Sequence, residues 1–364
     1  MLINQWYSCN VNPQVRISYK ALESSCPREN TATLQYFYSM KRLFLSPRFL
    51  SNAILVAIVL SSSSHSVHAE ERWLESAAAS PYDAFMKQGD ALSEGVSKHW
   101  PRETRRAIAL VSLATDAYLK AVESDPTQGD PHYRIAALTH AYLTYHNNSS
   151  PAHLLRREIE HYNLFEKKSP LDSRLESVWF RRAIARTKLG GKASLSAGVD
   201  DYDHHLETID VSSPLRQRAA ALAHGNRAEL LMMLGRLPES IAGYEQALAF
   251  NDSSSTGYGL AVALDRDGQN TRARQVAGLY ARGDVGNSLL QSNIFFIPSG
   301  EVYYYIAIRA EGLGSPKMAA IAYRKFLELV PNSMYADKAR ANLRMLGGAG
   351  MNLWPGTPRR RGRQ

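Results

Sequence analysis

Three stretches of the chain place their core residues at the same steps. Each has a small residue, a tyrosine four residues later and a further apolar residue three residues after that. The sets are Ala114, Tyr118 and Ala121; Ser240, Tyr244 and Ala247; and Ala319, Tyr323 and Phe326. Positions i, i+4 and i+7 share one face of an α-helix, so each stretch predicts an amphipathic helix. Pro126, Asp252 and Pro331 follow at equal distances and predict the helix ends.

A second pattern precedes these helices and predicts the helix before each of them. It consists of one residue, a small residue four positions later and a glycine seven positions after that. The sets are Trp179, Ala183 and Gly190; His224, Ala228 and Gly235; Gly257, Ala261 and Gly268; and Tyr303, Ala307 and Gly314. The small residue lets two antiparallel helices approach closely, and the glycine predicts a tight turn between them.

The two patterns together are similar to the tetratricopeptide repeat (TPR) family, whose unit is a 34-residue helix–turn–helix. The best matches are residues 221–252 and 300–331, and weaker units lie near 81–126, 129–170, 176–214 and 254–285. The resemblance implies an all-α fold, an α-solenoid of about five to six TPR-like units, some degenerate. Three charged residues depart from the pattern, at Arg182, Arg227 and Glu158.

The domain boundaries follow from the extent of the repeats. Residues 70–346 are expected to form the solenoid, with an inserted segment at 285–300 and a capping helix at 333–346. Residues 347–364 are rich in glycine and proline and end in "RRRGRQ", so a disordered basic tail is expected there.

The segment before the solenoid has the pattern of a secretory signal peptide at residues 40–69. Lys41 and Arg42 are basic, residues 49–60 form a short apolar run, and "VHA" precedes Glu70. A signal peptide acts at an N-terminus, so residues 1–39 are interpreted as a mis-assigned extension that starts before the true initiator Met40. An uncleaved membrane anchor is the alternative, although twelve apolar residues are few for a membrane span. Both cysteines lie in residues 1–39, which leaves the exported chain without thiols.

Charge argues against nucleic acid as a partner. The formal net charge is +9, but residues 70–358 carry 33 basic and 32 acidic residues. The excess lies in the leader and the tail, whereas nucleic-acid binding needs basic charge concentrated on the folded surface. A membrane is expected to be contacted only transiently, through the signal peptide.

The sharpest candidate for chemistry is "DDYDHH" at residues 200–205. On a helix, Asp200 and His204 are four residues apart, as are Asp201 and His205, and such pairs can hold a divalent metal. The alternative is a solvated helix face around a packed Tyr202. The chain has no nucleophile elbow or phosphate loop, so neither an enzyme nor a cofactor is predicted.

The resemblance also implies a concave groove lined by the first helix of each unit. Carried over by register, its candidate partner-binding residues are Tyr133, His140, Phe180, Ile184, Asn226, Glu229, Tyr304 and Ile308. Within the tyrosine triplet, Tyr303 is expected to pack in the core and Tyr304 to face the groove. The family's clamp for C-terminal carboxylates uses lysines, asparagines and an arginine, and only Asn226 matches it.

The function implied by this resemblance is an exported, non-catalytic scaffold that binds a protein or peptide in the periplasm or cell envelope. One alternative is a metal-binding protein or metal-dependent enzyme centred on "DDYDHH". A second alternative is a cytosolic or membrane-anchored TPR adaptor, in which the apolar run at 49–60 is not removed.

Overall fold

The computed structural model describes residues 80–100, 102–145, 150–283 and 300–348. These residues form thirteen α-helices and no strand, which confirms the prediction of an all-α fold. The helices are α3 (Pro81–His99), α4 (Thr104–Ser124), α5 (Asp130–Tyr145), α6 (Ala152–Lys168), α7 (Leu175–Leu189), α8 (Lys192–Thr208), α9 (Pro214–Met233), α10 (Leu237–Phe250), α11 (Ser254–Arg266), α12 (Asn270–Gly283), α13 (Val302–Gly312), α14 (Pro316–Leu329) and α15 (Ala336–Gly348).

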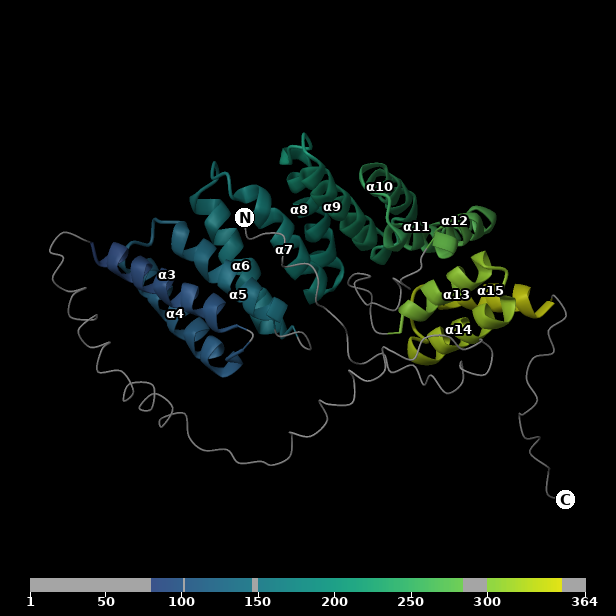
Figure 1. The fold of residues 1–364 in the computed structure, drawn as a ribbon, viewed down its shortest axis with the longest axis horizontal. Helices are drawn as coiled ribbons and strands as arrows, with labels where there is room; N and C mark the ends of the chain where they lie inside the picture. The colour runs from purple at the N-terminus through teal and green to yellow at the C-terminus, as the bar shows by residue number, and fades with distance from the viewer. Residues whose placement is uncertain (1–79, 101, 146–149, 284–299, 349–364) are drawn as a thin grey trace, which may run out of the picture.

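The helices form six consecutive pairs, from α3 and α4 to α13 and α14, followed by the single helix α15. Each helix packs against the next one in the chain, so the pairs make a continuous stack, as expected for an α-solenoid. The stack runs as an arch from α3 to α12, and α13, α14 and α15 lie below α11 and α12 (Figure 1). The row of pairs therefore turns back at its C-terminal end.

Serine side chains cap the first turn of three helices. Ser80, Ser213 and Ser253 each accept a hydrogen bond from the backbone N–H three residues later. Pro81 and Pro214 follow as first helical residues, where a missing N–H costs no hydrogen bond. These caps place the starts of α3, α9 and α11 where the local sequence specifies them.

The predicted glycine turns are confirmed. Gly190, Gly235, Gly268 and Gly314 follow the first helix of their pairs with φ between 66° and 88°. This left-handed conformation strains residues that carry a Cβ atom, so glycine allows each chain reversal at little cost.

The small residues of both patterns and the tyrosines and phenylalanine of the first pattern lie in the core, as predicted, whereas Trp179, His224 and Tyr303 of the second pattern are partly exposed. Every residue in the following list is at most 1% exposed: Ala114, Tyr118, Ala121, Ala183, Ala228, Ser240, Tyr244, Ala247, Ala261, Ala307, Ala319, Tyr323 and Phe326. The rings pack against the first helix of their own pair, Tyr118 against Gly89 of α3 and Tyr323 and Phe326 against Tyr304 of α13.

Helix α11 is enclosed on all sides. All ten residues from Thr256 to Asp265 are buried. Their sequence, "TGYGLAVALD", is apolar almost all round, which is the pattern of a helix surrounded by other helices. Helices α9, α10, α12 and α13 all pack against it.

Part of the predicted domain organisation falls outside the described residues, namely the signal peptide with its extension, most of the inserted segment at 285–300, and the tail from 349 onward. The expected capping helix at 333–346 corresponds to α15, whose bounds are Ala336–Gly348. Gly347 and Gly348 therefore belong to this helix and not to the tail.

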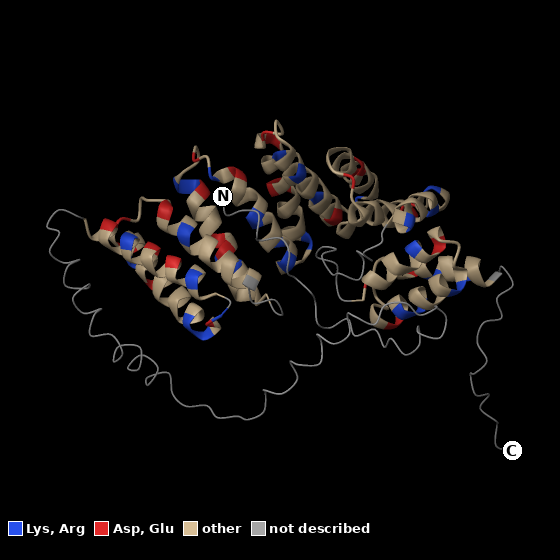
Figure 2. Cartoon of the chain, viewed as in Figure 1, with Lys and Arg blue, Asp and Glu red and all other residues tan. Residues whose placement is uncertain are grey.

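Basic and acidic residues are interspersed along the described helices (Figure 2). This agrees with the near-neutral charge of residues 70–358. None of the helices that the structure describes is long and apolar enough to cross a membrane.

Candidate functional site

The eight predicted partner-binding residues divide into two groups by exposure. Tyr133 and His140 on α5 and Phe180 and Ile184 on α7 are partly exposed. We call these four residues the α5–α7 face. The remaining four lie on α9 and α13 and are at most 4% exposed: Asn226, Glu229, Tyr304 and Ile308.

The prediction that Tyr304 and Ile308 face a groove is wrong. Tyr304 has no exposed surface and Ile308 is 1% exposed. The hydroxyl of Tyr304 donates a hydrogen bond to Asp265 on α11 at 2.6 Å. Its ring packs edge-on against Tyr323 and Phe326 of α14, at centroid distances of 5.3 and 5.2 Å. Tyr304 is therefore a core residue that joins α11, α13 and α14.

Tyr303 also differs from the prediction, and the structure decides the place of Tyr305, which the sequence left open. Tyr303, expected in the core, is partly exposed, and Tyr305 is 1% exposed. The triplet thus places its second and third rings inside and its first ring at the edge of the core. Helix α13 packs against α11 as well as against α12 and α14. The side of α13 that the repeat pattern leaves free is therefore covered by α11.

Asn226 and Glu229 on α9 are likewise buried, at 4% and 2% exposure. The carboxylate of Glu229 accepts hydrogen bonds from Tyr244 at 2.6 Å and from Tyr305 at 3.1 Å. Burial raises the pKa of Glu229, and these hydrogen bonds offset only part of that shift. The bond from Tyr305 joins residues 76 positions apart, so it bridges α9 and α13 directly.

The four residues on α9 and α13 are buried, and not at a groove, because the stack turns tightly at these helices. Helices α9, α11 and α13, the first helices of three successive pairs, contact one another. Gly278 of α12 and Gly312 of α13 let these two helices approach closely, because a Cβ on Gly312 would lie 2.4 Å from the backbone nitrogen of Gly278. The side that would form a groove in an open solenoid is closed and filled with tyrosines.

The "DDYDHH" segment lies on α8, and its side chains do not converge. Asp201 is buried and pairs with Arg182 at 2.6 Å and Arg186 at 2.8 Å. His205 is also buried, and its Nδ1 lies 2.8 Å from the backbone oxygen of Glu176. Asp200 and His204 are exposed to solvent.

The interpretation of these four residues as a metal site is therefore wrong, because two arginines already neutralise Asp201. Within the parts of the chain that the structure describes, no three histidine, cysteine, aspartate or glutamate side chains come together to hold a metal.

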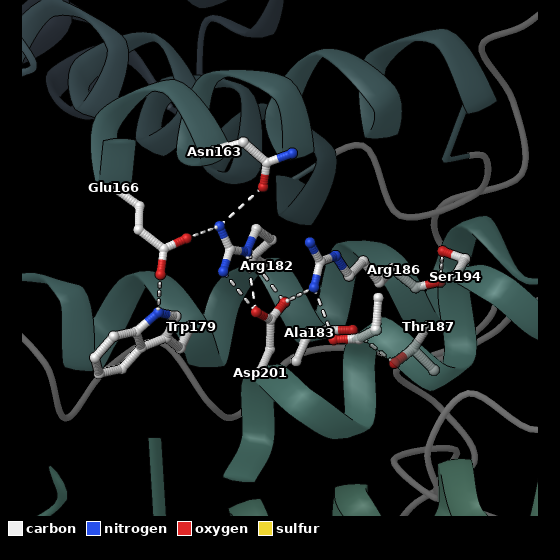
Figure 3. A network of polar contacts seen from close by, with 10 residues as sticks. Asn163, Glu166, Trp179, Arg182, Ala183, Arg186, Thr187, Ser194 and Asp201 are labelled. Atoms are coloured by element: carbon white, nitrogen blue, oxygen red, sulfur yellow. Dashed lines mark hydrogen bonds and ion pairs between the residues drawn. The ribbon is translucent and has the colours of Figure 1, made fainter. Parts of the chain in front are cut away.

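Arg182 is instead the centre of a polar network that joins α6, α7 and α8 (Figure 3). Its guanidinium binds Asp201 on α8 and donates to Asn163 on α6 at 2.8 Å. It also pairs with Glu166, whose other carboxylate oxygen accepts a hydrogen bond from Trp179 at 2.7 Å. Each charge in the network has an opposite partner, so the loss of one partner would leave a buried charge uncompensated.

The three charged residues that depart from the repeat pattern each pair with a residue on a neighbouring helix. Arg182 binds Asp201, Arg227 binds Asp203, and Glu158 lies 2.7 Å from Nδ1 of His140. The sequence marked these residues as unusual, but it did not indicate their partners. The partners come from helices 18 to 24 residues away, a separation at which a single sequence carries no pairing signal.

The α5–α7 face is the only predicted contact region that keeps exposed surface in the described structure. Tyr133 lies beneath Arg174, whose guanidinium is 4.6 Å from the ring centroid. Phe180 packs against Tyr202 and His205 at centroid distances of 5.7 and 5.1 Å. Ile184 is partly exposed and belongs to none of the core clusters formed by the described residues. Tyr133 on α5 and Phe180 and Ile184 on α7 therefore present partly exposed aromatic and aliphatic side chains.

Comparison with known proteins adds little to this description. No protein-family model and no curated protein matches the chain. Among solved structures, pilF of Pseudomonas aeruginosa aligns with 70% of this chain and 97% of its own, at 16% identity and a TM-score of 0.43. The TPR domain of P58(IPK) aligns with 81% of this chain and 96% of its own, at 13% identity and a TM-score of 0.25. Both scores are too low for an argument about function.

Proposed function

We propose that this protein is an exported, non-catalytic TPR-type scaffold that binds a protein partner through the α5–α7 face. The observation that carries the proposal is the partial exposure of Phe180 and Ile184, four residues apart on α7, in a stack of paired helices. Buried aromatic and aliphatic anchors supply most of the affinity in protein interfaces. A rigid frame lowers the entropy that binding must overcome.

A non-catalytic role is supported by the charged residues near this face. Asp201, Glu166 and Glu158 all have arginine or histidine partners. A general acid or base must lie within hydrogen-bond reach of the substrate. The carboxylates of these three residues instead form ion pairs or hydrogen bonds that join neighbouring helices.

Export is supported by the signal-peptide pattern at residues 40–69, which predicts a mature chain that starts at Glu70. Determination of the N-terminus of the protein purified from its native host tests this point. A chain that starts at Glu70 supports export. A chain that retains residues 49–60 supports the cytosolic or membrane-anchored adaptor.

Binding at the α5–α7 face is tested by site-specific photo-crosslinking in the native host. A photoreactive residue at Ile184 is expected to capture one protein reproducibly. Leu279 on α12 is the matched control, because it is apolar and 62% exposed but lies on another pair. Equal capture of the same protein at both positions would contradict the proposal.

The captured partner then allows a quantitative test. Ile184→Glu is expected to weaken its binding by about 2 kcal/mol, since the change places a charge in the apolar centre of the interface. Leu279→Glu is expected to leave the affinity unchanged. Isothermal titration calorimetry gives both values, and circular dichroism checks that each variant keeps its helical content.

A further inference from the structure

The open side of helix α7 carries two cations and no acidic residue. Successive residues of an α-helix are about 100° apart, which places one set of side chains on this side. We call this set the α7 stripe: Ser177, Phe180, Arg181, Ile184 and Lys188. Lys188 is exposed and the other four are partly exposed. Glu176, the one acidic residue of α7, pairs instead with Arg216 of α9.

Neither cation of the α7 stripe has a carboxylate partner. Among the described residues, no ion pair includes Arg181 or Lys188. The charge of Glu158 on α6 acts on both cations. Its carboxylate is 1% exposed, however, and lies 2.7 Å from Nδ1 of His140. The stripe therefore keeps an excess of positive charge at its surface.

The two cations lie in a recess that solvent reaches. Burial lowers the pKa of Lys188, and the charge of Glu158 offsets only part of this shift. The side chain of Lys188 nevertheless keeps exposed surface. Arg181 has Tyr162 of α6 and Tyr133 of α5 as neighbours. Charges among protein atoms interact more strongly than charges in bulk water, so these cations gain more from an incoming carboxylate than fully hydrated ones do.

Ile184 lies between the two cations. It follows Arg181 by three residues and precedes Lys188 by four, so all three share one side of the helix. Arg181 and Lys188 are about 10 Å apart along the helix axis. An extended peptide covers this distance in about three residues. The spacing fits an apolar side chain on Ile184 with an acidic residue on each side of it.

We propose that the α7 stripe binds an extended, acidic segment of a protein partner. An apolar residue of the segment lies on Ile184, and carboxylates of its side chains pair with Arg181 and Lys188. Complementary charge selects such a segment and repels a basic one. The inference rests on the proposed function, because Phe180 and Ile184 belong to both the α7 stripe and the α5–α7 face. It adds the chemistry of the partner.

The test selects ligands from a library of random linear peptides with the purified protein as the target. Enriched peptides are synthesised with an amidated C-terminus, so that only their side chains carry carboxylates. They are expected to contain an apolar residue between two acidic ones. Replacement of the acidic residues by their amides is expected to weaken binding at least about tenfold, as measured by fluorescence anisotropy. This comparison depends on no variant of the protein.

A matched pair of double variants locates the effect on the protein. Arg181→Gln/Lys188→Gln is expected to weaken the enriched peptides at least about tenfold, because it removes both cations. Lys317→Gln/Arg324→Gln is the control on α14. These two cations also lie seven residues apart around an isoleucine, Ile321, but both are exposed. The control is expected to leave the affinity unchanged. Equal losses in the two double variants would overturn the inference, since any positive charge would then serve.

Charge reversal gives a readout that a loss of folding cannot imitate. Lys188→Glu changes an exposed side chain and is expected to weaken the acidic peptides. A peptide with lysine at one of its acidic positions is expected to bind this variant at least about tenfold more tightly than it binds the unmodified protein. Failure of every such peptide to regain binding would overturn the inference. Circular dichroism checks the helical content of each variant.

Ile184→Glu distinguishes this inference from the proposed function. Enriched peptides that need Ile184 but not Arg181 and Lys188 would retain the α5–α7 face as a binding site and overturn its acidic preference. If no enriched peptide depends on Ile184, the α5–α7 face is not the binding site, and both proposals fail. Peptides that depend on all three residues support both.

Discussion

The three N-terminal pairs, α3 to α8, and the C-terminal part, α9 to α15, follow the same repeat pattern but pack differently. The buried apolar residues of α10 to α15 and the end of α9 form one continuous cluster. Those of α3 to α8 divide into four smaller clusters, one of which continues onto α9. The second and third of these pairs are joined by an ion pair between Glu166 of α6 and Arg182 of α7.

This difference shows that one repeat pattern is compatible with two curvatures. In the C-terminal part the first helices of successive pairs touch, and the hydroxyl groups of Tyr304 and Tyr305 donate hydrogen bonds to buried carboxylates on α11 and α9. In the N-terminal pairs α5 and α7 keep partly exposed faces. Surface for a partner is therefore retained where the stack is more open.

The strongest test of the comparison replaces one predicted groove residue from each part. Tyr304→Ala is expected to lower the free energy of unfolding by about 3–5 kcal/mol, because it opens a cavity in the core. Ile184→Ala is expected to cost about 1 kcal/mol or less, since its side chain is partly exposed. Urea unfolding followed by circular dichroism measures both. Similar losses would mean that the two parts do not differ in packing.

The second test removes the ion pairs of Arg182, which join α7 to α6 and to α8. Arg182→Ala is expected to cost about 3–5 kcal/mol, because it leaves the buried Asp201 with one cation instead of two. Arg236→Ala is the control: it removes an exposed pair with Glu239 and is expected to cost about 1 kcal/mol or less. Urea unfolding followed by circular dichroism measures both losses. A loss below about 1 kcal/mol for Arg182→Ala would show that the network is not needed.

The third test changes the curvature of the C-terminal part. Gly312→Ala is expected to destabilise the protein by about 1–3 kcal/mol, because the new methyl group would overlap the backbone of α12. Gly225→Ala is expected to stabilise it by up to about 1 kcal/mol, since the nearest atom lies 4.0 Å from the new Cβ and alanine favours the helix. Thermal unfolding of the two variants reports the opposite signs. The same sign for both would refute the role of close backbone contact in the turn.

The smallest expected effect concerns pH. Nδ1 of His132 and Nδ1 of His161 lie 3.0 Å apart between α5 and α6. Burial, with the neighbouring His132 and Arg157, lowers the pKa of His161 to about 4 from an ordinary value of 6.5. Below pH 6.5 the unfolded chain therefore takes up a proton that the folded chain does not. The free energy of unfolding of the N-terminal pairs is expected to fall by about 1–2 kcal/mol between pH 7 and pH 5. This fall levels off below pH 4.

His161→Gln is expected to reduce this acid sensitivity, as measured by urea midpoints at pH 7 and pH 5. Glu229 in the C-terminal part acts in the opposite direction, because burial raises its pKa. Its folded form holds a proton at a pH where the unfolded form has lost it, so acidification through that window increases stability. An unchanged acid response in His161→Gln would show that the histidine pair does not cause it.

The local structure follows from residues that lie close together in the sequence. The steps from Ala319 to Tyr323 and Phe326 predict a helix and its buried face, and Gly314 predicts the turn before it. These features depend on helix periodicity and on backbone conformation, which act within a few residues. The signal peptide and the basic tail stay predictions, because they lie outside the described residues.

The curvature of the stack is decided only in three dimensions. Asn226, Glu229, Tyr304 and Ile308 were expected at a groove because one repeat unit cannot show how sharply the next unit turns. The turn depends on the contact of Gly278 with Gly312 and on the hydrogen bond from Tyr305 to Glu229, between residues 34 and 76 positions apart. The sequence alone determined which residues face the interior of each helix pair. The tertiary structure decided which remaining faces are covered, because burial depends on helices that are distant in the chain.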